Sequence, residues 1–137
     1  MKLKHQPFGY GEGQSGHLVT AEGICITSRD SAVLSGATGV IALEATLVIV
    51  DLSGLRVATH SIVDGMGALM DELEKRNPAP RVVWIIGTKI SMLLASLELA
   101  DLFEQRESCR DVPELAGLDS PGSPMKSPAD IGERSGF

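Results

Sequence analysis

The chain has 137 residues, 43% of them hydrophobic and 4% aromatic, and a formal net charge of −6 at pH 7. This length allows one domain with a buried core. An acidic surface repels phosphate backbones, and few aromatic rings are available to stack on bases, so we expect no nucleic-acid binding. No apolar run is long enough to cross a bilayer and none follows Met1, so we expect no membrane insertion and a cytoplasmic location.

Glycine dominates the beginning of the chain, at positions 9, 11, 13 and 16. These glycines neither follow a strong strand nor lead into a helix, as a phosphate-binding glycine loop requires. We expect residues 1–16 to form a flexible arm or a hairpin turn. The following segment, residues 17–27, is predicted to be a strand with a bulge or kink at Glu22-Gly23.

Two helices and a strand are predicted between residues 28 and 75. The first helix begins at Ser28–Asp30 and carries an apolar stripe as far as Ile41. Leu47–Val50 is a β-branched run typical of a buried strand, and we expect it to stop at Asp51 and Gly54. A second amphipathic helix then begins near Ser61, where Ser61-x-x-Asp64 resembles a capping box. Its apolar face contains Ile62, Met66, Leu69, Met70 and Leu73.

A second buried strand is predicted at Arg81–Ile86, followed by a helix from Thr88 or Lys89 and a short edge strand at Phe103–Arg106. Residues 111–137 are rich in proline, glycine, serine and charge, so we expect a mostly disordered tail with one short helix near Val112–Leu118. The alternation of strands and helices predicts a single α/β domain over residues 17–110, with a mixed or mostly parallel sheet flanked by helices.

No motif in the sequence indicates catalysis. HExxH, GxSxG and GKS/T patterns are absent from the sequence, and Cys25 and Cys109 lack the spacing of a zinc site. Neighbouring His60 and Ser61 have no evident orienting acid, and the helix carboxylates are typical of a solvated face. We therefore expect no catalytic residue, no metal, no cofactor and two reduced thiols.

Several short segments together resemble a STAS domain, the fold of bacterial anti-sigma-factor antagonists and stressosome proteins. They are "LVIVDLSG", "GMGALMDELEKR", "RVVWIIG" and "LELADLF", and the resemblance covers residues 18–103. It implies a regulatory module without catalytic activity of its own, and a protein partner such as an anti-sigma factor of the serine-kinase type or a STAS assembly.

The same resemblance implies a switch site. Counted without gaps from Asp51, the family's Asp-Ser-Ser-Gly loop falls on Thr59-His60-Ser61-Ile62, so Ser61 matches the phosphoserine of sporulation-type antagonists and His60 the Ser/Thr of the stressosome type. Thr59 and Ile62 depart from the family's acid and glycine. The implied partner-docking loop contains Asp51, Ser53, Gly54, Thr59, His60, Ser61 and Asp64.

Two functions remain open from the sequence. In the first, Ser61 is phosphorylated and the added charge at a helix start on a docking face abolishes partner binding. In the second, Ser61 only caps its helix, and the domain is a non-switching accessory subunit of a larger complex such as a lipid-transport ATPase.

Overall fold

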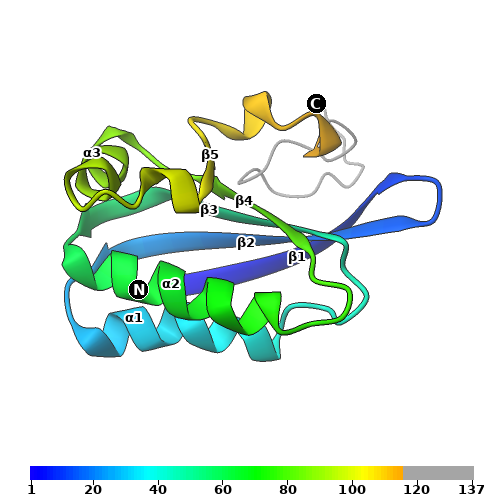
Figure 1. Cartoon of the computed structure of the whole chain (residues 1–137), viewed down its shortest axis with the longest axis horizontal. Coiled ribbons are helices and arrows are strands. Elements are labelled where there is room, and N and C mark those ends of the chain that lie inside the picture. The colour runs from blue at the N-terminus through cyan, green and yellow to red at the C-terminus, as the bar shows by residue number, and fades with distance from the viewer. Residues whose placement is uncertain (116–137) are drawn as a thin grey trace, which may run out of the picture.

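Five strands form one sheet in the order β1-β2-β3-β4-β5 (Figure 1), within residues 1–115, the part of the chain that this computed structural model describes. β1 is antiparallel to β2, and every other neighbouring pair is parallel, which confirms the predicted mixed, mostly parallel sheet. The strands are β1 (Lys2–Gly11), β2 (Gln14–Cys25), β3 (Leu47–Ala58), β4 (Arg81–Ile85) and β5 (Glu104–Arg106).

Three α-helices connect the parallel strands: α1 (Ser28–Ser35), α2 (His60–Glu74) and α3 (Thr88–Ser96). The first is shorter than predicted, because the chain tightens at Gly36 into the 3-10 helix η1 (Gly36–Gly39). As predicted, α2 crosses between the parallel neighbours β3 and β4. Further 3-10 turns are η2 (Ala100–Leu102), η3 (Cys109–Asp111) and η4 (Pro113–Leu115).

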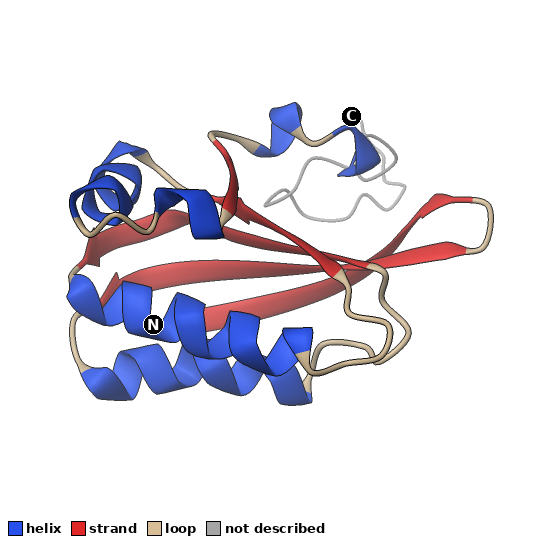
Figure 2. Ribbon diagram, viewed as in Figure 1, coloured by secondary structure: helices blue, strands red, loops and turns tan. Residues whose placement is uncertain are grey.

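Each face of the sheet has its own apolar core, because alternate residues of a strand point to opposite faces. The larger core joins one face to α1, α2 and α3, and it includes Val48, Val50 and the fully buried Trp84, whose ring meets Phe103 edge-on. The smaller core lies on the other face, where Val112 and Leu115 cover Leu47, Ile49, Val83 and Ile85. Figure 2 shows α1 and α2 side by side along the sheet.

Of the two structures expected for the beginning of the chain, a flexible arm or a hairpin turn, the hairpin is the one that forms. Residues 2–11 form β1, which pairs along its length with β2 and makes the sheet edge. The glycines here serve a hairpin rather than a loose segment: Gly13 turns it with a φ of +68°, and Gly16 leaves room for the Phe8 ring. The domain therefore includes residues 1–16, which composition alone placed outside it.

The expected end of β3 at Asp51 and Gly54 is also wrong, because the strand continues to Ala58. Only Leu47–Asp51 pair with β4, whereas the pairing with β2 extends to Ala58 through two register shifts. The two shifts lie on either side of Glu22-Gly23, the predicted bulge, where Gly23 has a φ of +100°. These bulges allow β3 to continue through Asp51 and Gly54, residues that a regular strand disfavours.

Beyond β5, part of the expected tail is ordered. Asp111 ends η3, Pro113–Leu115 form η4 within the predicted short helix, and Val112 and Leu115 are buried, so the domain extends past residue 110. The rest of the predicted tail, residues 116–137, lies outside the described residues. No helix within residues 1–115 is long and apolar enough to cross a membrane.

Candidate functional site

The candidate site lies where α2 begins, beside the end of β2. Thr59 leaves β3 in an extended conformation, and its amide donates to the Cys25 carbonyl oxygen at 3.0 Å. Its hydroxyl donates to the Ile26 carbonyl oxygen at 3.1 Å and accepts from the Ser61 amide at 3.4 Å. Thr59 therefore caps α2 and holds the helix start against the end of β2.

This geometry corrects the predicted capping box at Ser61 and Asp64. The helix begins at His60, and its cap is Thr59, two residues before the predicted cap Ser61. Ser61 is the second residue of α2, and its hydroxyl donates to the Ile26 carbonyl oxygen at 3.0 Å. Two hydroxyls thus share one carbonyl oxygen, and Ser61 links α2 to β2 instead of capping α2.

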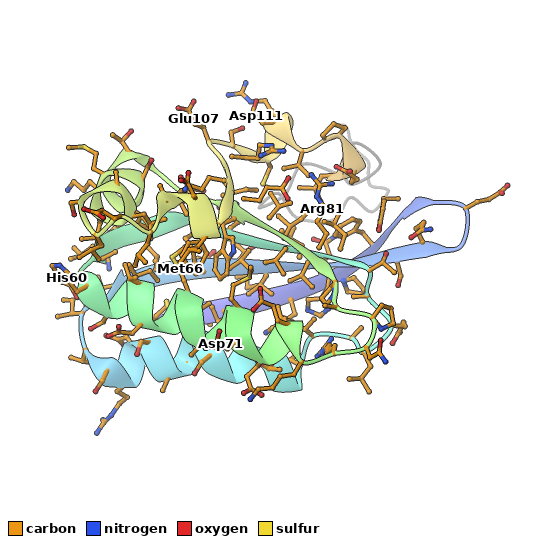
Figure 3. The ribbon with its side chains drawn as sticks, in the orientation of Figure 1. His60, Met66, Asp71, Arg81, Glu107 and Asp111 are labelled. Carbon is orange, nitrogen blue, oxygen red and sulfur yellow. The ribbon has the colours of Figure 1, made fainter. Side chains whose placement is uncertain are left out.

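The side chains around this link are accessible. Ser61 is half-buried, while His60 and Asp64 are exposed. Figure 3 shows His60 at the left end of the molecule. Ile24, Ile26 and Val57 are also exposed, by 37%, 45% and 46%, and Ile24 and Val57 are partners across the β2–β3 pairing. An aliphatic patch of this kind beside a helix start suits contact with another protein.

The predicted docking loop is divided in the structure. Thr59, His60 and Ser61 share the start of α2, but Asp51, Ser53 and Gly54 lie within β3. The carboxylate of Asp51 is buried and accepts from the Ser53 amide at 2.9 Å and from the Cys109 thiol at 3.4 Å. This second cluster anchors the chain after β5 to the sheet and does not face the start of α2.

Cys109 is the residue of this cluster that sequence analysis missed, because 58 positions separate it from Asp51 and no local motif links them. Burial, followed by the nearby negative charge of Asp51, raises the pKa of the Cys109 thiol to about 12. The thiol therefore stays protonated at neutral pH and acts as a hydrogen-bond donor. Cys109 and Cys25 are both free, and Cys25 is buried in β2 as predicted.

A pair of imidazoles forms a third polar cluster, away from the start of α2. His17 is buried, and its Nε2 lies 2.8 Å from Nδ1 of His5 on the neighbouring strand. Its Nδ1 accepts from the Ala42 amide at 3.4 Å. Among residues 1–115, no three His, Cys, Asp or Glu side chains lie close enough together to hold a metal ion.

Comparison with known proteins gives a likeness in structure only. No protein-family model matches the sequence, and no curated protein matches it. The anti-sigma factor antagonist SpoIIAA, solved in its unphosphorylated form, superposes with a TM-score of 0.56 at 14% identity over 87% of this chain and 100% of SpoIIAA. An anti-sigma factor antagonist from Mycobacterium paratuberculosis gives a TM-score of 0.55 at 19% identity over 80% of this chain and 90% of its own.

This chain has the STAS fold. The element order that the resemblance implied is therefore correct, although the sequence identity is low. Within that STAS fold, Ser61 lies at the start of α2, where the counted motif places it. The likeness concerns the fold, so the role of each site residue in this chain rests on its own geometry.

Proposed function

We propose that this STAS domain is a regulatory protein-interaction module of the anti-sigma-factor-antagonist kind, acting in the bacterial cytoplasm, and that phosphorylation of Ser61 switches its partner binding. The observation that carries the proposal is the half-buried Ser61 hydroxyl in the first turn of α2, bordered by exposed Ile26 and His60. The partner is a protein such as an anti-sigma factor of the serine-kinase type or a STAS assembly.

Phosphorylation would change the site in two ways. It converts the hydroxyl that donates to the Ile26 carbonyl oxygen into a phosphate that cannot donate there, so this hydrogen bond is lost while those of Thr59 remain. It also adds about −1.5 to −2 charges at a helix start, where unpaired amides favour an anion. The phosphate is thus held by α2 itself, and the docking surface changes both its charge and its shape.

The comparison supports this function at the level of protein class. Both similar structures are anti-sigma factor antagonists, and SpoIIAA is described in its unphosphorylated form. The role of Ser61 is supported only by its own position in the first turn of α2. Among the hydroxyls at this surface, that of Ser61 lies in the first turn of α2, and the thiol of Cys109 in the second cluster is strongly protonated.

One observation favours the alternative, a non-switching accessory subunit of a larger complex such as a lipid-transport ATPase. Ile62 occupies the position where the family's loop has glycine, and its side chain is fully buried in the larger core. A buried isoleucine there fixes the start of α2 more firmly than glycine would. In that function Ser61 remains unmodified, and its hydrogen bond to Ile26 is purely structural.

The Ser61 series separates the two functions. We expect Ser61→Ala to bind the partner, identified by pull-down and then purified, with native affinity. It should lose about 1 kcal/mol of stability through the missing hydrogen bond to Ile26. Ser61→Asp should fold but bind at least about tenfold more weakly, since a fixed charge then lies on the docking surface. Affinities measured by isothermal titration calorimetry test this.

Ser35→Asp is the matched control, because Ser35 is also a half-buried helical serine but lies at the end of α1. It should bind the partner as the native chain does. Equal affinities of the native, Ser61→Ala and Ser61→Asp chains would reject the switch and favour the accessory subunit. Mass spectrometry of the chain isolated from its source cell would show directly whether Ser61 carries a phosphate.

A further inference from the structure

Four exposed cations without an ion pair gather at the end of the sheet where α2 begins. Among residues 1–115, the exposed lysines and arginines that form no ion pair are Lys2, Arg29, Arg56, Lys89 and Arg110. The first four lie, in that order, at the start of β1, at the start of α1, near the end of β3 and at the start of α3. Because β1 is antiparallel to β2, and β2 is parallel to β3, the start of β1 lies at the same end of the sheet as the ends of β2 and β3. We call these four side chains the basic end.

Few carboxylates at this end oppose the four cations. Glu22 is paired with Lys4, and Asp30 accepts from the amides of Ile26 and Thr27, which lowers its pKa to about 2. Two further exposed acids near this end are Asp64, in the second turn of α2, and Glu107, directly after β5. The chain as a whole carries a net charge of −6, so the positive charge of this end is opposite in sign to that of the whole molecule.

The helices increase this polarity. Figure 1 shows α1 and α2 both beginning at this end, and α3 follows the end of β4, so the partial positive charges of the three helix starts add to those of the side chains here. Neither α2 nor α3 has an acidic residue in its first turn. The far end of α2 instead carries exposed Asp71, Glu72 and Glu74, an arrangement that the helix dipole disfavours. Helix stability therefore does not explain this distribution of charge.

We propose that the basic end, together with the aliphatic patch of Ile24, Ile26 and Val57, binds an acidic amphipathic helix of the partner protein. This inference rests on the proposed function and specifies the chemistry of the partner. Leucine-like side chains of that helix cover the patch, and its carboxylates face the four cations. A phosphate on Ser61 acts against the same segment, because it repels those carboxylates and neutralises the positive field that attracts them.

A protein segment fits this surface better than a nucleic acid or a membrane. The patch is aliphatic, and Phe8, Tyr10, Trp84 and Phe103 lie in other parts of the fold, which leaves His60 as the one ring among the described residues at this end for a base to stack on. The net charge of −6 also opposes long-range attraction to a polyanion or an anionic bilayer. A partner with a few carboxylates around an apolar stripe avoids that repulsion.

Three synthetic 16-residue helical peptides test the proposal against the full chain. They share one leucine stripe and carry glutamate, glutamine or lysine on the polar face. In NMR titrations of the ¹⁵N-labelled chain, we expect the glutamate peptide to bind about tenfold more tightly than the lysine peptide at low salt, with shifts at Ile24, Ile26 and Val57. This difference should shrink at 0.5 M salt. Arg56→Glu and Arg29→Glu should each weaken the glutamate peptide several-fold.

Arg110→Glu is the matched control, because Arg110 is also exposed and forms no ion pair among the described residues. It adjoins Asp111, which Figure 3 shows on another side of the molecule from His60. It should leave peptide affinity unchanged. Equal binding of the three peptides, or tighter binding of single-stranded RNA or phosphatidylserine vesicles, would overturn the proposal. Concentration-dependent self-association through the acidic end of a second copy, seen by sedimentation velocity and lost in Arg56→Glu, would overturn it too.

These outcomes are separable from those of the Ser61 series. If the acidic peptide shows no preference while Ser61→Asp still weakens the purified partner, the inference fails and the proposed switch stands. If the acidic peptide binds as expected but equally well to the Ser61→Asp chain, the partner chemistry is supported and the switch is contradicted. Thermal unfolding of each variant confirms that the substituted chains remain folded.

Discussion

At the scale of single residues, the contacts of the His5–His17 pair determine the tautomer and the charge of the two imidazole rings. The Ala42 amide donates to Nδ1 of His17, so the neutral ring holds its proton on Nε2 and donates to Nδ1 of His5. Burial lowers the pKa of His5, and burial together with the charges of His5 and Arg76 lowers the pKa of His17, below the usual 6.5. Both rings are therefore neutral near pH 7.

This pair makes stability depend on pH. Because both native pKa values are lowered, the stability they contribute is complete above about 6.5, the unfolded value, and is lost as pH falls from there through the lower native values. We expect urea midpoints of the native chain to fall between pH 7.5 and pH 5.5. The His5→Gln/His17→Gln chain should show a smaller fall, and an identical fall in both chains would contradict this origin.

Gly16 provides a second test at the residue scale, because the Phe8 ring lies against it across the β1–β2 pair. A Cβ at this position would lie 2.4 Å from Cζ of Phe8, well inside van der Waals contact. We expect Gly16→Ala to cost about 1–3 kcal/mol in chemical unfolding. The added substitution Phe8→Leu should recover part of that loss. A neutral Gly16→Ala would show that the ring moves freely aside.

At the scale of elements, β1 is the part that composition least revealed. Removing residues 1–11 would leave the edge of β2 unpaired and take the buried Phe8 from the smaller core. We expect this truncation to lower the free energy of unfolding by about 3 kcal/mol or more. A truncated chain that unfolds at the native urea concentration would restore the original expectation of a flexible arm.

The elements recovered from the sequence are those with one clear periodicity. The apolar face of α2 is buried at Ile62, Met66, Leu69 and Leu73, and the strand Arg81–Ile85 and the edge strand Glu104–Arg106 occur where expected. The errors lie where a local signal competes with pairing. Asp51 and Gly54 are poor strand residues, yet β2 pairs with this part of β3 through bulges that no periodicity predicts.

The candidate site illustrates the same limit. Counting along the motif located Ser61 near the start of α2, but its hydrogen bond to Ile26 joins residues 35 positions apart. The cap of α2 is Thr59 and not Ser61, because the helix already begins at His60. Likewise, the contact between Cys109 and Asp51 exists only once the chain after β5 folds back over the sheet. Such contacts depend on topology, which a single sequence specifies only indirectly.

At the scale of the whole molecule, the smaller core is covered by a short segment that contains Val112 and Leu115. Removing residues 108–137 would expose Leu47, Ile49, Val83 and Ile85, and would break the Arg81–Glu114 ion pair. We expect the melting temperature to fall by about 10 °C, since Val112 and Leu115 each contribute roughly 1.5–3 kcal/mol. Removing only residues 120–137, whose composition offers little to bury, should leave it nearly unchanged. Differential scanning calorimetry distinguishes the two truncations.

The burial of Trp84 provides an optical probe of the domain. The sequence contains one tryptophan, and its indole is fully enclosed in the larger core, with no hydrogen-bond partner for Nε1 among the described residues. Its fluorescence therefore arises from a dry, apolar environment, with short-wavelength emission and little quenching by acrylamide. Docking at the basic end leaves that environment covered, whereas unfolding brings the indole into water. A shift to longer wavelength on adding a partner would thus reveal rearrangement of the core, without any label on the chain.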